Sequence, residues 1–343
     1  MTTRIAINGF GRIGRGVLRA LIETDRCDIE VVAINDLAPA ETLAHLLKYD
    51  SVHGRLNVPV EISGEELHVG RHRIRLSALR NPADLSWQGV DVAYECTGLF
   101  TDRDKAALHL QNGTSRVLIS APGKDADRTV VYGVNHGDLT AQDVIVSNAS
   151  CTTNCLAPVA MVLDAAFGIE TGYMTTIHAF TGDQPSHDTS HKDLYRARAA
   201  SLSMVPTSTG AARAISLVLP QLAGRLEGSA VRVPTPNVSL IDLTFMAREP
   251  VTREAINDVM RAAASDGLAG ILSYEEDPLV SIDFNHDPHS SCFAAAQTAV
   301  TADGLVRVVS WYDNEWGFSN RMIDTGQHMG RLLYDAAPQR LAG

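Results

Sequence analysis

Arg4-Ile5-Ala6-Ile7-Asn8 runs directly into Gly9-Phe10-Gly11-Arg12-Ile13-Gly14, and this stretch decides the fold of the first half of the chain. The apolar residues predict a short buried strand, the glycines form a complete G-x-G-x-x-G turn, and a helical pattern follows over residues 13–22. In this context the glycines let the backbone approach a pyrophosphate that rests on the helix N-terminus. The stretch therefore predicts a dinucleotide site with Gly9, Gly11 and Gly14 at its turn.

A second predicted strand ends in a carboxylate at the position that such a site needs. Residues 30–35 form a buried strand that ends at Asp36, 22 residues after Gly14. A carboxylate at about this distance accepts hydrogen bonds from an adenine ribose. The alternative, a glycine turn that only tightens a connection between strand and helix, is less well supported in this context.

Strands and helices continue to alternate further along the chain. Residues 90–96 and 116–120 predict buried strands, and residues 103–110 between them predict a helix. This alternation is typical of a doubly wound parallel sheet, which binds ligands at the carboxyl ends of its strands. Thr97-Gly98 and Ser120-Ala121-Pro122 follow two of these ends and are either ligand-binding turns or ordinary turns.

A cysteine stands at the start of the next predicted helix. The segment Ser147-Asn148-Ala149-Ser150-Cys151-Thr152-Thr153-Asn154-Cys155 follows an apolar run and leads into a helical pattern that ends before Gly168. The free N–H groups and the dipole at a helix N-terminus favour an anion, so we expect the Cys151 thiol to ionise more easily than a free thiol. Cys151 is then either a nucleophile or a small apolar residue packed under the helix.

A histidine follows on the next predicted strand. Residues 172–177 lead into His178, with Thr181 three residues later. A single histidine is usually structural or solvated. However, a thiol and an imidazole on adjacent elements can form the Cys–His pair that activates sulfur, and only geometry establishes such a pair.

The second half of the chain also carries candidate anion-binding groups. The polar stretch 182–200 contains Lys192, Arg196 and Arg198. It is either a solvated loop or subunit contact, or a segment in which one of the two arginines neutralises a substrate phosphate. Residues 206–210 precede a predicted helix in another geometry that binds anions. Strand 238–246 and a hairpin that turns at Ala302-Asp303-Gly304 indicate an antiparallel sheet.

Composition limits the class of protein. The chain has 343 residues, of which 45% are hydrophobic, and this is enough for two domains. Its formal charge of −11 disfavours nucleic acid as the main partner. No apolar run approaches the roughly 20 residues of a membrane span, and residues 1–5 lack the core of a signal peptide, so we expect a cytoplasmic protein. The five scattered cysteines argue against a disulfide framework, and the C-x3-C spacing of Cys151 and Cys155 argues against a zinc site, so no metal is expected.

Long collinear motifs resemble phosphorylating glyceraldehyde-3-phosphate dehydrogenases of the bacterial type, and the likeness covers nearly the whole chain. These motifs are residues 6–15, 147–155, 196–210, 232–237 and 311–315. The resemblance implies an α/β fold with a Rossmann doubly wound parallel sheet in residues 1–150, completed by a C-terminal helix at 317–343. It also implies an α+β catalytic domain with a mostly antiparallel sheet in residues 151–316, NAD as the cofactor, and a cytoplasmic homotetramer.

The family's reaction implies roles for particular residues. Cys151 would add to the aldehyde of glyceraldehyde 3-phosphate, and His178 would take the protons while hydride passes to NAD. Inorganic phosphate would then attack the thioester to give 1,3-bisphosphoglycerate. The positions that match the family's two phosphate sites are Thr181 and Arg232 for the substrate's phosphate, and Ser150, Thr152, Arg196, Thr209 and Gly210 for the attacking phosphate. The positions that match its cofactor site, besides the three glycines, are Arg12, Ile13, Asp36, Arg80, Ser120 and Asn314.

Two departures from the family pattern leave alternatives open. Thr189-Ser190 resembles members that also accept NADP, whereas the Asp36 carboxylate would repel a 2′-phosphate, so NAD is favoured and some NADP use stays open. Residues 283–289 also resemble erythrose-4-phosphate dehydrogenase, which is the second candidate. A scaffold without turnover and a thiol acyltransferase or hydrolase using Cys151 and His178 alone are alternatives from other classes.

Overall fold

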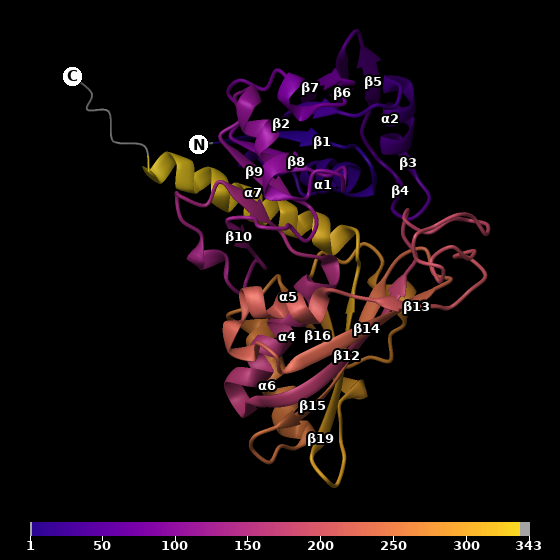
Figure 1. The fold of residues 1–343 in the computed structure, drawn as a ribbon, viewed down its shortest axis with the longest axis vertical. Coiled ribbons are helices and arrows are strands. Elements are labelled where there is room, and N and C mark those ends of the chain that lie inside the picture. Colours follow the sequence, from indigo (N-terminus) through magenta and orange to yellow (C-terminus); the bar gives the residue numbers. More distant parts are fainter. Residues whose placement is uncertain (1, 337–343) are drawn as a thin grey trace. The chain divides into compact units, whose positions relative to one another are not determined.

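The computed structural model describes residues 2–336, which divide into two compact units. The first unit contains the chain up to Ala149 and the segment from Ser319 onward, and the second contains Ser150–Phe318. Each unit is built around its own large sheet (Figure 1). Within the described residues, no helix combines the length and the apolar character needed to cross a membrane.

The first unit has the architecture of the predicted Rossmann domain. Its nine-stranded sheet has the order β10-β11-β9-β8-β1-β2-β7-β6-β5, and neighbours from β10 to β7 run parallel. The strands in chain order are β1 (Thr3–Asn8), β2 (Ile29–Asn35), β5 (Val60–Ser63), β6 (Glu66–Val69), β7 (His72–Ser77), β8 (Val92–Glu95), β9 (Arg116–Ile119), β10 (Arg128–Thr129) and β11 (Ile145–Ser147). The doubly wound parallel sheet that the alternation predicted is confirmed, and antiparallel β5 and β6 extend its edge.

The helices of the first unit differ from the prediction in one place. They are α1 (Arg12–Glu23), α2 (Ala40–Lys48), α3 (Arg103–Ala106) and most of α7 (Trp316–Ala336), with a short hairpin of β3 (Tyr49–Asp50) and β4 (Gly54–Arg55). The single helix expected at 103–110 is a short α-helix followed by the 3-10 helix η2 (Ala107–Asn112). Of the helix expected at 317–343, residues 337–343 lie outside the described part.

The second unit is mostly antiparallel, as expected, but two of its strand pairs run parallel. The main path of its sheet is β13-β14-β12-β15-β19-β17-β16, with β18 beside β19. Its strands are β12 (Ile169–Ala179), β13 (Val205–Ser208), β14 (Leu226–Val233), β15 (Ser239–Ala247), β16 (Leu272–Glu275), β17 (Ser291–Ala294), β18 (Ala299–Val300) and β19 (Leu305–Tyr312). The pairs β12–β14 and β16–β17 are parallel, which is compatible with the mostly antiparallel sheet that was expected. In both cases the connecting segment is long enough for a crossover.

One face of this second sheet is covered by helices. Helix α4 (Cys151–Phe167) lies against β12, β15, β17 and β19, while α5 (Ala211–Val218) packs on β14 and α6 (Arg253–Ser265) on β16 (Figure 1). Because side chains alternate along a strand, buried Met174, Thr176 and His178 share one face of β12. Strand periodicity therefore puts the His178 imidazole on the buried face of the sheet.

Candidate active site

Helix α4 opens with Cys151, and the chain is fixed tightly just before it. The Ser150 hydroxyl accepts a hydrogen bond from the Thr153 N–H at 3.0 Å, as an N-cap residue does. Ala149 has a φ of 56°, a left-handed conformation that residues other than glycine rarely adopt. Cys151 is thus held in the first turn, where backbone N–H groups have no partner within the helix.

The expected Cys–His pair is present in this geometry. The Cys151 Sγ lies 3.4 Å from Nε2 of His178, which stands near the end of β12. The ring is buried, and it meets Tyr312 edge-on with 5.9 Å between ring centroids. As a whole residue, Cys151 is only partly buried, in contrast to Cys155 four residues later. The structure therefore favours the nucleophile over the packed apolar residue.

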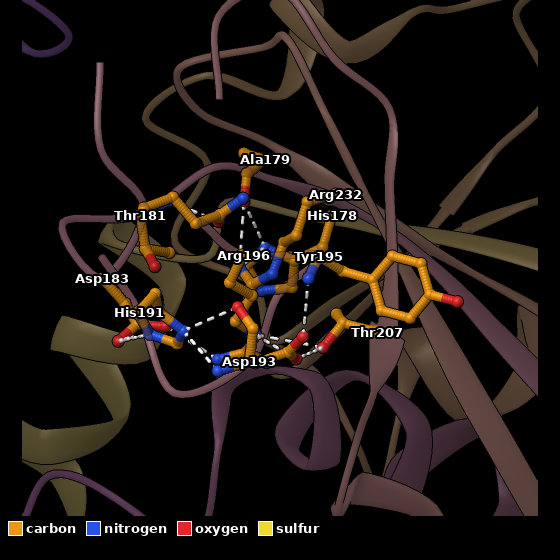
Figure 2. Close-up of polar contacts among 11 residues, drawn as sticks. His178, Ala179, Thr181, Asp183, His191, Asp193, Tyr195, Arg196, Thr207 and Arg232 are labelled. Atoms are coloured by element: carbon orange, nitrogen blue, oxygen red, sulfur yellow. Dashed lines mark hydrogen bonds and ion pairs between the residues drawn. The ribbon is translucent and has the colours of Figure 1, made fainter. Parts of the chain in front are cut away.

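The other ring nitrogen of His178 has two competing neighbours. Nδ1 lies 2.6 Å from the Ala179 carbonyl oxygen and 2.7 Å from Nη1 of Arg232, and this Nη1 also donates to the carbonyl at 3.0 Å (Figure 2). One nitrogen cannot donate to the carbonyl and accept from the guanidinium at once. If Nδ1 carries the proton, Nε2 presents a lone pair to the thiol; if it does not, Nε2–H points at the sulfur.

Burial keeps both members of the pair neutral. It raises the pKa of the Cys151 thiol, although the Arg232 charge and contacts with Thr152 oppose the rise. Burial, reinforced by the charge of Arg232, lowers the pKa of His178 to about 3. The expectation that Cys151 ionises more easily than a free thiol is therefore wrong for the thiol by itself, because desolvation is the largest influence on its pKa. A neutral imidazole beside a neutral thiol is an arrangement for general-base catalysis.

Tyr312 supports the first turn of α4, a role that sequence reasoning missed. Its hydroxyl lies 2.9 Å from the Thr152 Oγ1 and 3.0 Å from the Thr176 Oγ1. This links the helix residue next to Cys151 to the strand that carries His178. Thr152, expected at a phosphate site, has its hydroxyl against Tyr312 and is buried. The available signal was the position of Tyr312 on an alternating strand, directly before Asp313-Asn314.

The two arginines expected at phosphate sites, Arg196 and Arg232, lie close enough for their charges to interact. Arg196 donates to the Asp183 carboxylate at 2.7 Å and to the Thr207 hydroxyl at 3.0 Å (Figure 2). Burial and the nearby charge of Arg196 lower the pKa of Arg232. The Nε of Arg232 is buried and makes no hydrogen bond. A buried N–H without a partner, close to a second guanidinium, is well suited to an anion.

The remaining residues expected at the phosphate sites lie in nearby turns of the second unit. Gly210 is the N-cap of α5, and the Thr209 hydroxyl accepts from the Ala211 N–H at 3.2 Å. The Thr181 N–H donates to the Gln184 side chain at 3.2 Å. Within the described residues, no direct hydrogen bond joins these three to Cys151 or His178.

The glycine turn of the first unit borders a cavity of about 280 Å³. The cavity lies at the carboxyl ends of β1, β2 and β8, and it is lined by Asn8, Gly9, Gly11, Asn35, Asp36, Leu37, Leu79, Arg80, Cys96, Thr97, Leu99 and Phe100. A Cβ on Gly14 would lie 2.3 Å from the Gly9 carbonyl, whereas one on Gly11 would meet open space. Gly14 is thus needed for close packing, and Gly11 leaves room for a ligand to approach the backbone, which fits a dinucleotide.

The other residues expected at the cofactor site differ in their contacts. Asp36 follows β2, and its carboxylate accepts from the N–H groups of Phe10 at 2.7 Å and Ala38 at 2.9 Å, which fixes its orientation. Arg12 forms an ion pair with Asp50. Ile13 lies in the first turn of α1, and Ser120 directly follows β9.

Asn314, which was also expected at the cofactor site, belongs to the second unit. There its Oδ1 accepts a hydrogen bond from the Ser239 hydroxyl at 2.8 Å.

A buried polar network next to the cavity was not predicted. The Glu95 carboxylate accepts from Asn8 Nδ2 at 2.7 Å, lies 2.9 Å from Nε2 of His109, and bonds the hydroxyl of Thr97. Glu95 and His109 are fully enclosed. The network ties strand ends to the Thr97 turn that lines the cavity. Its members come from three separate segments, so no local pattern reveals it.

Comparisons with known proteins agree with this arrangement. Residues 3–103 match the family model of the glyceraldehyde 3-phosphate dehydrogenase NAD binding domain, and residues 150–314 match that of the C-terminal domain of the same family. The chain belongs to the glyceraldehyde-3-phosphate dehydrogenase family.

Relatives that carry this family's name cover almost the whole chain. The chain is 64% identical to glyceraldehyde-3-phosphate dehydrogenase of Cereibacter sphaeroides over 97% of its own length and 100% of the relative's. It is also 64% identical to that of Xanthobacter flavus, with the same coverage. Its identity to that of Pseudomonas aeruginosa is 60%, over 95% of this chain and 97% of the relative. In the family's terms, the NAD binding domain contains the glycine turn and the C-terminal domain contains the Cys151–His178 pair.

Proposed function

We propose that this protein is an NAD-dependent, phosphorylating dehydrogenase that converts D-glyceraldehyde 3-phosphate and inorganic phosphate to 1,3-bisphosphoglycerate. The observation that carries the proposal is the 3.4 Å contact between Cys151 Sγ and His178 Nε2 beside the partnerless Nε of Arg232. A nucleophile, a base and an anion site in one place suit a phosphorylated aldehyde.

In the first step, the substrate's phosphate engages Arg232. The guanidinium then leaves Nδ1 of His178 free to donate its proton to the Ala179 carbonyl, so Nε2 carries the lone pair. Nε2 takes the thiol proton as the sulfur forms a bond to the aldehyde carbon. It returns that proton to the carbonyl oxygen, which gives a hemithioacetal on Cys151. The backbone N–H of Cys151 and the His178 side chain stabilise the oxyanion.

In the second step, His178 Nε2 takes the hemithioacetal hydroxyl proton while the carbon loses hydride, leaving a thioester on Cys151. Bound NAD supplies the hydride acceptor. The resulting imidazolium retains the proton beside the sulfur.

In the third step, inorganic phosphate attacks the thioester carbon and the carbon–sulfur bond breaks. Arg196 and the α5 N-terminus at Thr209-Gly210, together with Ser150 and Thr152, form the proposed site for this phosphate. The departing sulfur recovers its proton from His178, and the acyl phosphate releases the phosphate proton to solvent. The protein is thereby returned to its starting state.

We infer that the first unit holds NAD at Gly9, Gly11, Gly14, Arg12, Ile13, Asp36, Arg80 and Ser120. Asn314 matches the family's cofactor site by its place in the sequence. The fixed Asp36 carboxylate supports a preference for NAD, since it would repel the 2′-phosphate of NADP. Thr189-Ser190 supports residual NADP use. Erythrose-4-phosphate dehydrogenase, the second candidate, is not favoured, because the relatives reported above carry the glyceraldehyde name.

We further propose a cytoplasmic homotetramer. The loop after β12 exposes large apolar side chains in the single chain: Leu194 is 83%, Leu202 80% and Met204 75% exposed. Such a patch is typical of a subunit contact. Light scattering coupled to size-exclusion chromatography should give four times the 36.9 kDa chain mass, and a monomer would contradict this part of the proposal.

The activity is tested by the rate of NADH formation. Glyceraldehyde 3-phosphate and erythrose 4-phosphate are compared, each with NAD or NADP and with or without inorganic phosphate. We expect the highest kcat/KM for glyceraldehyde 3-phosphate with NAD, and steady-state turnover that requires phosphate. Tight NAD binding without turnover would instead indicate a scaffold, and absence of NAD binding would favour a thiol acyltransferase or hydrolase.

A further inference from the structure

The segment before β17 brings together three side chains that the proposed reaction does not use. A carboxylate oxygen of Asp287, a ring nitrogen of His289 and the Sγ of Cys292 all lie within 4.8 Å of one another. They follow one another as D-x-H-x-x-C, and Asp287 and His289 belong to the stretch 283–289 that resembles erythrose-4-phosphate dehydrogenase. Cys292 is the second residue of β17, and its thiol is fully buried.

We propose that Asp287, His289 and Cys292 bind a zinc ion. Zinc takes carboxylate oxygen, imidazole nitrogen and thiolate sulfur at about 2.0–2.3 Å, so tetrahedral ligands lie about 3.3–3.8 Å from one another. Side-chain rotations that move each ligand atom by about an ångström would bring the three atoms from their present separations of up to 4.8 Å to that spacing. A thiolate in the set favours zinc over magnesium or calcium, which prefer oxygen alone. The proposal departs from the expectation of no metal.

The backbone around the three ligands is held from both sides. The N–H of His286, a residue with a φ of 71°, donates to the Asp313 carboxylate at 2.7 Å. The N–H groups of Ser290 and Ser291 donate to the Ile271 carbonyl at 2.9 and 3.2 Å. The ligands therefore sit on a fixed frame, which lowers the entropic cost of assembling a metal site.

Charge balance also fits a divalent cation. In the protein alone, Nδ1 of His289 lies 2.8 Å from Oδ1 of Asp287. A zinc ion bound by the Asp287 carboxylate, the His289 imidazole and the Cys292 thiolate would pair two anions and a neutral imidazole with two positive charges. This leaves no net charge in a partly buried site.

The site has an access route and an open coordination position. The side chains of Asp287 and His289 are 26% and 27% exposed, whereas the thiol lies beneath them. An ion can enter past the two exposed ligands and reach the sulfur last. Three protein ligands leave the fourth position for water, as in sites that are not purely structural.

Cobalt substitution tests the proposal on the full chain with Cys151→Ser, which removes a second accessible thiol that attracts soft metals. After chelator treatment, Co²⁺ should bind one per chain, with a thiolate-to-cobalt charge-transfer band and strong tetrahedral d–d bands, and Zn²⁺ should displace it. Adding Cys292→Ser should abolish the charge-transfer band and weaken Zn²⁺ binding at least about 100-fold, and His289→Gln should weaken it about 10- to 100-fold.

Cys27→Ser in the same background is the matched control, because Cys27 is an exposed thiol far along the chain from the three ligands. It should leave stoichiometry and spectrum unchanged. A charge-transfer band that survives Cys292→Ser, or no tetrahedral cobalt spectrum at all, would overturn the proposal. Far-ultraviolet circular dichroism verifies folding, and Asp287→Asn, on a partly exposed residue, gives an independent variant with the same expected loss if Cys292→Ser does not fold.

Discussion

The first and second turns of α4 each present a cysteine, and their surroundings differ in a way that separates a nucleophile from a packing residue. Burial raises the pKa of both thiols, that of Cys155 to about 12. Cys155 is enclosed, with its sulfur 3.4 Å from the Ser291 hydroxyl and 3.8 Å from the Ser310 carbonyl. Cys151 instead has an imidazole nitrogen at 3.4 Å and is partly exposed. Access and an adjacent base, rather than a low thiol pKa, distinguish the reactive cysteine.

The largest expected effect comes from replacing the sulfur of each cysteine by oxygen, in two separate variants. Cys151→Ser should lower kcat for NADH formation by at least about 10⁴-fold, since removing a nucleophile has effects of this size. Cys155→Ser should keep kcat within about threefold and act on stability instead. Steady-state kinetics on both variants measures the contrast, and a similar loss in the two would remove the distinction between the turns.

The next effect tests the base His178, which contacts the cysteine of the first turn and not that of the second. His178→Asn should lower kcat by about 10²- to 10⁴-fold, because Nε2 takes protons in two steps. Since burial raises the pKa of the Cys151 thiol, little thiolate exists near pH 7 without a base. Iodoacetamide alkylation of Cys151 should therefore be at least about tenfold slower in the variant at pH 7.

Alkylation at higher pH provides the control for that experiment. As pH rises toward the raised pKa of the thiol, hydroxide removes the proton in both proteins, so their alkylation rates should converge. A constant ratio between the two rates up to pH 10 would mean that His178 positions the reagent rather than accepting the proton.

A smaller effect is expected when the anion site beside the base is weakened. Arg232→Gln should reduce kcat/KM for glyceraldehyde 3-phosphate by about 10- to 100-fold, the amount expected for one charge-assisted contact of about 1.5–3 kcal/mol. Unphosphorylated glyceraldehyde, which has no anion for Arg232 to bind, serves as the matched substrate and should change by less than about threefold. Equal losses for both aldehydes would show that Arg232 acts on His178 alone.

The smallest effect concerns the hydroxyl that joins the first turn of α4 to β12. Tyr312→Phe removes the hydroxyl that joins Thr152 to Thr176, leaving two buried hydroxyls with one partner fewer. This should lower the free energy of unfolding by about 1–3 kcal/mol, measured as a shift of the urea midpoint. Tyr334→Phe, whose hydroxyl bonds Asp91 in a less buried place, is the control and should cost less. Equal costs would mean that the Tyr312 bridge contributes no special support.

Much of the first unit could be predicted from local sequence. The run from Arg4 to Gly14 specifies strand, turn and helix, because glycine placement and apolar periodicity are local properties. Asp36 could be placed at a strand end for the same reason. The edge strands β5 and β6 could not be placed in the sheet in the same way, since their attachment to β7 depends on pairing far from the turn residues.

The second unit and the chemistry of its site were less predictable. The parallel pairing of β12 with β14 depends on which strands become neighbours, and a pattern of alternating residues does not encode this. The order of Cys151 before a helix and His178 after a strand indicated a pair, but not that burial would keep both groups neutral. The roles of Tyr312, Thr207 and the Glu95–His109 network required partners from distant segments.

In the proposed reaction, the Cys151 sulfur is already covalently attached to the substrate when hydride leaves. A single-turnover experiment without phosphate tests this directly, by mixing protein, NAD and glyceraldehyde 3-phosphate, recording the NADH burst, and locating the adduct by peptide mass spectrometry after acid quench. The proposed reaction should give one NADH per active chain and a phosphoglyceroyl adduct on Cys151. A full burst with the adduct on Cys155 or another residue, or with no adduct, would contradict it.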